Sequence, residues 1–419
     1  MSAAKPAPPS GATDPAPGPE RPAGSKSGNG DRAAQVLREV STGTFGVTFL
    51  AFVLALVIGG LLIIAVDDDV ADAASYLFAR PADFFTAAWS AVSEAYAALF
   101  RGAVFNYEAS TVSGAIKPLT ETMTAATPLI IAALGVAVGF RAGLFNIGAQ
   151  GQVIMGATIA GFVGFTWNLP VGIHLLVALL GGVIAGGLWA GIAGLLKART
   201  GAHEVIVTIM LNYVALYLLQ FLLTTDAFST GNQPKSPSVK STAQLPLLLG
   251  DGFRLNAGFL LAILSAVFVW WLMSRSTIGF RFRAVGSNAH AARTAGMSVT
   301  ATFVLVMIVS GALAGLAGAT QVLGTEKFLT DGIAGSLGFD AITVALLGRS
   351  RPLGIFLAGL LYGGLNVGGR VMEVSTGTPI DIVLVIQSLV VLFIAAPPLV
   401  RAIFHLPAPR TGASKEVAA

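Results

Sequence analysis

Three side-chain amides lie close together in a glycine-rich stretch of this chain. Asn146, Gln150 and Gln152 fall within residues 143–152, together with three glycines. An amide both donates and accepts hydrogen bonds, which suits an uncharged, polyhydroxylated ligand. Irregular backbone is tolerated at membrane depth only where it is buried in protein or lines a cavity. The three amides are therefore candidates for a substrate pathway, and the alternative is that they hold neighbouring helices together.

A second stretch, residues 279–297, combines basic side chains with the signals of a short helix. Ser287 or Asn288 is a good N-cap, residues 289–295 form a compact helical run, and Gly296 suits the left-handed position after a helix. We therefore expect a short helix between two longer ones, and the alternative is a basic loop that only orients the chain. The basic residues of this stretch are Arg281, Arg283 and Arg293.

Two acidic residues lie at or within apolar segments. Glu204 precedes a long apolar run, where it can pair with a basic residue of the preceding segment or meet another protein. Asn212 and Tyr213 follow about two helical turns later and are candidates for the pathway. Asp340 lies inside an apolar stretch, so it is a functional hypothesis by default. The alternative is that Asp340 sits at the outer interface and caps its helix.

Several kinds of chemistry are excluded by the sequence. The chain has no cysteine, and its four histidines lack metal-ligand spacing. It contains neither the phosphate-binding motif of ATPases nor a serine nucleophile elbow. The acidic run at residues 67–69 is interpreted as a solvated loop, and the basic residues are too dispersed for a nucleic-acid surface. We expect no catalytic residue, no metal site and no cofactor bound by this chain.

The elements that must position these residues are membrane helices. The chain is 54% hydrophobic and only 11% charged, whereas a soluble domain is about one-quarter charged. A helix needs roughly 20 apolar residues to cross the hydrocarbon core. The sequence predicts an all-α, polytopic bundle with about ten such segments, of which the eighth is a half-helix or a tilted span. They are residues 44–66, 117–140, 142–166, 171–196, 205–225, 255–274, 298–324, 337–347, 352–369 and 382–400.

The rest of the chain divides into tails and loops. Residues 1–43 are interpreted as a disordered cytoplasmic tail, residues 44–400 as the transmembrane domain and residues 401–419 as a second cytoplasmic tail. Residues 67–117 are expected outside the membrane, with an amphipathic helix at 81–105 that lies on the membrane or packs on the bundle. Lysine and arginine concentrate in the alternate loops, including 275–298, which predicts that both termini are cytoplasmic.

The basic stretch resembles the cytoplasmic coupling-helix segment of ABC importer permeases of the ribose and branched-chain amino acid superfamily. That segment has the pattern G-x-x-x-x-A-x-G-x-N-x-x-A-A-x-x-x-G, and a proline that commonly follows its Asn is Ala289 here. The resemblance implies that the short helix docks on an ATP-binding subunit, with Glu204 as a further contact. The matching residues are Gly279, Ala284, Gly286, Asn288, Ala291, Ala292 and Gly296.

Three further stretches resemble the nucleoside subgroup of this superfamily. Residues 143–152 are similar to its F-N-I-G-x-x-G-Q segment, residues 201–212 to G-x-x-E-V-I-x-T-x-M-x-N, and residues 338–348 to G-x-x-x-I-x-V-A-L-x-G. These matches imply an importer in the bacterial cytoplasmic membrane that moves its substrate by alternating access. Nucleoside is the first choice of substrate, a simple sugar the second and a branched-chain amino acid the third.

The resemblance also implies a set of partners. They are an ABC ATPase that carries the ATP, a second permease that is identical or related, an extracytoplasmic substrate-binding lipoprotein and the membrane lipid. The rival of another class is a secondary transporter. Such proteins carry intramembrane carboxylates for ion coupling, and the central segments here hold almost none.

Overall fold

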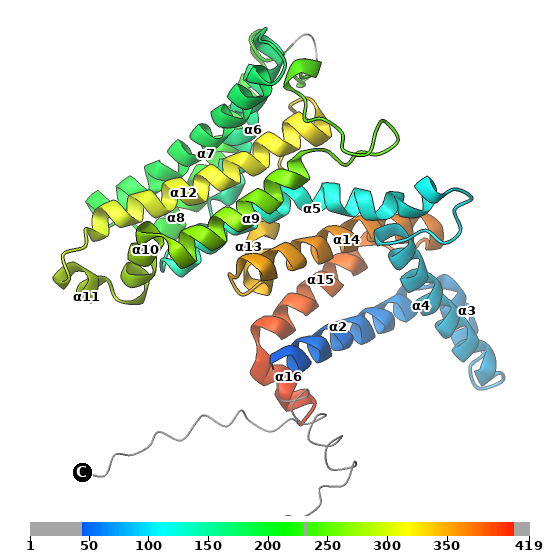
Figure 1. Ribbon diagram of the computed structural model, residues 1–419. Coiled ribbons are helices and arrows are strands. Elements are labelled where there is room, and N and C mark those ends of the chain that lie inside the picture. Colours follow the sequence, from blue (N-terminus) through cyan, green and yellow to red (C-terminus); the bar gives the residue numbers. More distant parts are fainter. Residues whose placement is uncertain (1–43, 230, 232, 406–419) are drawn as a thin grey trace, which may run out of the picture.

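The structure is a computed structural model that describes residues 44–229, 231 and 233–405. It is built from helices, which Figure 1 shows as a bundle of long segments running in alternating directions. The expected tail at 1–43 lies outside the described residues. Of the expected tail at 401–419, residues 401–405 are described and begin with the last turn of α16, and residues 406–419 lie outside the described part. The helices are α2 Thr44–Val66, α3 Asp68–Ser75, α4 Pro81–Ala103, α5 Val112–Arg141, α6 Ala149–Thr166, α7 Ile173–Thr200, α8 Glu204–Leu222, η1 Ser241–Ala243, α9 Gly258–Arg275, α10 Thr277–Ser287, α11 Ala289–Thr294, α12 Val299–Thr320, the π-helical η2 Gln321–Glu326, α13 Leu337–Leu347, α14 Pro352–Thr376, α15 Ile380–Ala395 and α16 Pro397–Ile403.

Helix α5 is the centre of the bundle, and most of its residues are buried. On one side it packs against α12, which in turn contacts α6 and α7, and on the other side against α14. A second hydrophobic cluster joins α2, α4, α14 and α15. Since lipid tails are as apolar as these side chains, packing rather than hydrophobicity holds such helices together.

Glycines set the contact between α6, α7 and α12. A Cβ atom on Gly156 would lie 2.3 Å from the carbonyl oxygen of Gly315, and one on Gly186 would lie 2.3 Å from that of Gly311. The three helices therefore touch through their backbones, which only small residues allow. This close packing fixes the position of the start of α6.

The expected number of about ten spans is not confirmed. Among the described residues, seven helices are long and apolar enough to cross a membrane, namely α2, α5, α7, α8, α9, α12 with η2, and α14. Helix α6 has 18 residues but carries two glutamines among its first four. Helix α13 has 11 residues, a length of about 16 Å that is roughly half of the hydrocarbon core. A half-helix at 337–347 was one of the two forms predicted for that segment.

The last apolar segment is bent rather than straight. Helices α15 and α16 meet at an angle of 95°, so the segment that we predicted as the tenth span, residues 382–400, is broken by a bend. Pro397 follows the break and Pro398 the next position. Proline has no backbone N–H to donate and its ring clashes with the preceding turn, which explains why the helix ends here.

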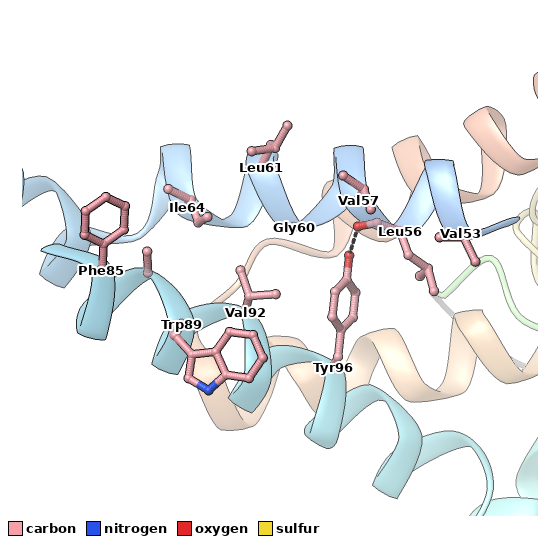
Figure 2. A pocket seen from close by; sticks show the side chains of 11 residues that line it. Val53, Leu56, Val57, Gly60, Leu61, Ile64, Phe85, Trp89, Val92 and Tyr96 are labelled. Atoms are coloured by element: carbon pink, nitrogen blue, oxygen red, sulfur yellow. Dashed lines mark hydrogen bonds between the residues drawn. The ribbon is translucent and has the colours of Figure 1, made fainter. Parts of the chain in front are cut away.

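The predicted amphipathic helix is present as α4, which packs on the bundle against α14 and α2. Figure 2 shows the apolar groove between α2 and α4, lined by Val53, Leu61, Phe85 and Trp89 among others. The Tyr96 hydroxyl, which also lines this groove, donates a hydrogen bond to the carbonyl oxygen of Leu56. The groove therefore presents almost no free polar group.

Basic residues collect at one end of the bundle, which we name the basic end. It comprises the loops that connect α5 to α6, α7 to α8, α9 to α12 and α13 to α14. Contacts join these loops: the Arg141 Nε donates to the Ser350 carbonyl oxygen at 2.8 Å, and the Lys197 ammonium lies over the Phe303 ring. The basic residues here are Arg141, Lys197, Arg199, Arg275, Arg281, Arg283, Arg293, Arg349 and Arg351.

Candidate functional site

A polar cavity of about 350 Å³ opens between α5, α13 and α14, close to the lower limit of roughly 300 Å³ for small-molecule sites. Its lining mixes carboxylates, guanidinium groups, amides and hydroxyls, in contrast to the apolar groove between α2 and α4. It is the better candidate for a polar ligand. The polar residues that line it are Glu121, Thr124, Arg254, Gln321, Thr325, Glu326, Thr330, Ser336, Asp340, Tyr362, Asn366 and Arg370.

Asp340 is the one predicted pathway residue that lines this cavity. It lies in the first turn of α13 and is half-buried. Its Oδ2 accepts a hydrogen bond from the Ser336 hydroxyl at 2.6 Å, and its Oδ1 accepts one from the Tyr362 hydroxyl at 3.1 Å. The helix dipole also favours a carboxylate here. Neither hydrogen bond caps a backbone N–H of α13, and the choice between the pathway role and the capping role of Asp340 stays a prediction.

Gln150 holds the beginning of α13 in place. Its Nε2 donates to the carbonyl oxygen of Gly335 at 2.6 Å, and its Oε1 accepts from the backbone N–H of Gly338 at 2.7 Å. A Cβ atom on Gly338 would lie 2.2 Å from the backbone nitrogen of Gln150, so α13 and α6 meet in direct backbone contact. Gln150 thus satisfies two backbone groups next to the cavity without lining it.

Asn146 and Gln152 form a closed pair in the interior. The two amides exchange two hydrogen bonds of 2.9 Å, and the Asn146 Nδ2 also donates to the Ser310 hydroxyl at 2.8 Å. Both side chains are fully buried. Since Ser310 is in the middle of α12, the chain re-enters the bundle before α6 begins. In this structure these amides do what our alternative interpretation described, holding helices together.

The two pathway candidates on α8 differ from each other. The Asn212 Oδ1 accepts from the backbone N–H of Gly151 at 2.8 Å, and its Nδ2 donates to the carbonyl oxygen of Ile147 at 2.9 Å. Asn212 therefore fixes the irregular backbone before α6. The Tyr213 side chain is 53% exposed on the outside of the bundle. Neither residue lines the polar cavity.

The predicted short helix is present as α11. The Asn288 side chain accepts from the backbone N–H of Ala291 at 3.0 Å, so Asn288, not Ser287, is its N-cap. Gly296 has φ of 81° as expected. The preceding residues are not a loop but a second helix, α10, which is capped by Ser276. Together α10 and α11 form a helical hairpin on the basic end.

Within this hairpin the predicted coupling residues divide into exposed and packed groups. Ala292 is buried with Val285 and Val299. A Cβ atom on Gly286 would lie 2.6 Å from the carbonyl carbon of Ala142, so Gly286 packs against the end of α5. The side chains that remain exposed for a partner are those of Arg281, Asn288, Ala291 and Arg293, whereas Arg283 is half-buried and Gly296 is exposed at the turn.

Glu204 already has a partner within the chain. Its carboxylate forms an ion pair of 2.5 Å with the Lys197 ammonium, and the two side chains are only 12% and 22% exposed. Of the roles that we considered for Glu204, the structure shows the ion pair with a preceding basic residue. This pair ties the end of α7 to the start of α8.

The model of one protein family, described as the branched-chain amino acid transport system / permease component, matches residues 119–395. The chain belongs to this permease family. It is therefore a multi-pass membrane component of a transport system and not an enzyme. The matched range contains the polar cavity, the α10–α11 hairpin and the three amides.

Relatives with known roles are similar over most of this permease. A guanosine ABC transporter permease protein of Bacillus subtilis is 41% identical, covering 74% of this chain and 87% of that protein. A glucose ABC transporter permease protein of Haloferax volcanii is 38% identical, covering 66% and 75%. A nucleoside ABC transporter permease protein of Lactococcus lactis is 33% identical, covering 70% and 83%. No solved structure matches the chain.

Our sequence analysis missed most of the cavity. Tyr362, Asn366 and Arg370 lie four residues apart on α14, a spacing that puts them on one face of a helix. A polar stripe of this kind within an otherwise apolar span was a usable signal. By contrast, Arg254 and Glu121 meet through an ion pair of 3.3 Å that joins residues far apart in the chain, and nothing in the local sequence indicates that contact.

Proposed function

We propose that this permease moves nucleosides across the bacterial cytoplasmic membrane by an ATP-driven alternating-access mechanism. The single observation that carries this proposal is the 41% identity to a guanosine permease over 87% of its length. A second relative that is named for nucleoside transport is 33% identical. The amides, hydroxyls and charged groups of the polar cavity support a substrate with many hydrogen-bonding groups.

The basic end faces the cytoplasm in this proposal. Arginine and lysine in short loops orient membrane proteins with those loops inside. The α10–α11 hairpin then projects into the cytosol, where its exposed arginines are free to contact another protein. The polar cavity is reached from the opposite end, since Arg254, which precedes α9, lies at its rim.

The proposed complex has four kinds of subunit. An ABC ATPase binds and hydrolyses ATP, and its motion reaches this chain through α11. A second permease, identical or related, completes the pathway, and an extracytoplasmic lipoprotein delivers the substrate. The packing of Gly286 against the end of α5 supports this mechanism, because movement of the hairpin pushes directly on the central helix.

A simple sugar is the second candidate substrate. The observation in its favour is the 38% identity to a glucose permease. A sugar and the ribose of a nucleoside present the same hydroxyl chemistry to the cavity, so only the base distinguishes them.

Reconstituted uptake tests the proposal. The chain is assembled in proteoliposomes with the ATPase, the second permease and the binding protein, and uptake of radiolabelled guanosine, uridine and glucose is compared. We expect nucleoside uptake that requires ATP in the compartment that the ATPase faces. Uptake that persists without the ATPase or nucleotide contradicts the ABC mechanism, and uptake of glucose without nucleoside uptake contradicts the proposed substrate.

A further inference from the structure

We infer that Asp340, oriented by Ser336 and Tyr362, recognises the base of the substrate and selects nucleosides whose base carries a ring N–H donor on its hydrogen-bonding edge, as in guanosine and inosine. This inference rests on the proposed function, since it names the group within the polar cavity that recognises the nucleoside.

The carboxylate of Asp340 is oriented by two neutral hydrogen-bond donors. Each of its oxygens receives one hydroxyl hydrogen bond, from Ser336 and from Tyr362. A carboxylate oxygen accepts two hydrogen bonds, so one acceptor position per oxygen is left. None of the four ion pairs found among the described residues includes Asp340. A charge within an apolar membrane segment is costly and is retained where it has a function.

The chemistry of the remaining acceptor positions favours a particular base edge. Guanine carries a ring N–H and an amino group side by side, and these can donate to the two oxygens of one carboxylate. Adenine presents a ring nitrogen lone pair at the corresponding position, which faces the carboxylate as acceptor against acceptor. A site that is built for a hydrogen bond discriminates against a ligand that lacks the matching group.

The rest of the cavity supplies complementary groups for the sugar. Asn366 and Thr325 line it with Asp340 and carry donor and acceptor atoms. Glu121 also lines the cavity; its Oε2 accepts from Arg254, and its Oε1 is buried without a hydrogen-bond partner among the described residues. The cavity volume of about 350 Å³ limits the ligand to a small molecule.

The test measures nucleoside preference at the membrane step. The binding protein is saturated with one nucleoside at a time, so the uptake ratio reports the assembled complex rather than capture. The panel is guanosine, inosine, adenosine and 1-methylguanosine, whose methyl group blocks the ring donor. For the unaltered chain we expect guanosine and inosine to exceed the other two by about tenfold or more, the value of one charged hydrogen bond.

Two variants and one control decide the inference. Asp340→Asn has the same shape but can donate, and we expect it to shift the guanosine-to-adenosine ratio toward adenosine by about tenfold or more. Tyr362→Phe keeps the charge and removes one orienting bond, so the ratio should shift in the same direction by less. Asp381→Asn is the matched control, because Asp381 is an exposed carboxylate in the first turn of α15 and should leave the ratio unchanged.

Each contrary result overturns the inference. Unchanged ratios in Asp340→Asn remove Asp340 from base recognition. If that variant does not transport, Tyr362→Phe decides, and an unchanged ratio there has the same meaning. If uptake by the unaltered chain requires a sodium or proton gradient, the Asp340 carboxylate binds a cation rather than the base. Absence of all nucleoside uptake by the unaltered complex contradicts the proposed function itself, which separates the two failures.

Discussion

Gln150 is the side chain that connects the irregular backbone before α6 to the half-helix α13. Its amide satisfies one donor and one acceptor of the α13 segment, at Gly338 and Gly335. Each such bond contributes about 1 kcal/mol to stability. The effect on function is larger than this number suggests, because these two bonds set where the first turn of α13 places Asp340 in the polar cavity.

We predict that Gln150→Ala and Gln150→Glu both lower nucleoside uptake by about tenfold. Alanine removes both bonds, whereas glutamate keeps the acceptor for Gly338 and sets a second acceptor against the Gly335 carbonyl oxygen. Uptake kinetics and melting temperature in detergent are measured together. A small shift in melting temperature with a large fall in uptake is the expected pattern.

The control for Gln150 is Gln244→Ala. The Gln244 amide also donates one hydrogen bond of 2.8 Å to a backbone carbonyl, that of Val239, but in the loop before α9 and away from the cavity. It should keep normal uptake. If Gln150→Ala transports as well as Gln244→Ala does, Gln150 has only a packing role.

At the scale of single residues, the sequence predicted roles that depend on neighbouring residues, but it did not predict contacts between residues far apart in the chain. The capping role of Asn288 and the left-handed Gly296 follow from neighbours within a few residues, which the sequence displays directly. The partners of Gln150 lie 185 and 188 residues away. Residue type identified Gln150 as important, but only the packing of α6 on α13 reveals which groups it binds.

At the scale of elements, the α10–α11 hairpin combines a rigid base with an exposed tip. Its base is fixed by Gly279 and Gly286, whose absent side chains let α10 approach the backbone of α9 and α5. Its tip carries Arg293, which is exposed. In the proposed mechanism the base transmits motion and the tip contacts the ATPase.

We predict that Arg293→Glu lowers ATP-driven uptake by about tenfold while the permease keeps its melting temperature, because a reversed charge on a docking surface costs a few kcal/mol of binding. Co-purification of the ATPase and nucleotide-dependent uptake are the measurements. Arg80→Glu is the control, because Arg80 is an exposed arginine that precedes α4. Equal uptake in the two variants contradicts a docking role for α11.

Gly286→Val belongs to the same element but has another expected outcome. A branched side chain there meets the backbone of Arg141 and Ala142, so yield and melting temperature fall along with uptake. This variant therefore tests the packing at the base of the hairpin. Coupling without a loss of stability is tested by Arg293→Glu.

Hydropathy predicted the long helices and the short α13, but it did not settle which helices cross the membrane. The range of α13 was predicted because its apolar run ends sharply at both sides. The number of spans is not confirmed, because an apolar run does not reveal whether a helix crosses the bilayer or starts inside the bundle. Around the start of α6, Asn146 of the preceding loop accepts from the backbone N–H of Gly148, and Asn212 of α8 bonds the backbone of Ile147 and Gly151. These hydrogen bonds depend on tertiary contacts, which hydropathy does not reveal.

At the scale of the whole molecule, charge is separated along the direction of the helices. The basic end holds the exposed arginines of α10 and α11, whereas the acidic residues 67–69 follow the other end of α2. The Lys240 ammonium at that other end donates to the carbonyl oxygens of Thr166 and Trp167 at 3.0 Å, closing the loop over α6. The proposed orientation follows from this separation by the positive-inside rule.

Cysteine labelling tests that orientation in intact cells. The chain has no cysteine, so a single introduced thiol gives the only signal with a membrane-impermeant maleimide. We expect His290→Cys, on the exposed face of α11, to react only after permeabilisation, and Asp251→Cys, in the loop before α9, to react in intact cells. Asp72→Cys on α3 should behave like Asp251→Cys, because α2 separates it from the basic end.

Labelling of His290→Cys in intact cells reverses the bundle and puts the hairpin out of reach of any cytoplasmic ATPase. If Asp72→Cys and Asp251→Cys are instead labelled on different sides of the membrane, the number of crossings between α3 and α9 is not the proposed one. The docking role of the hairpin is then tested by the Arg293 experiment alone.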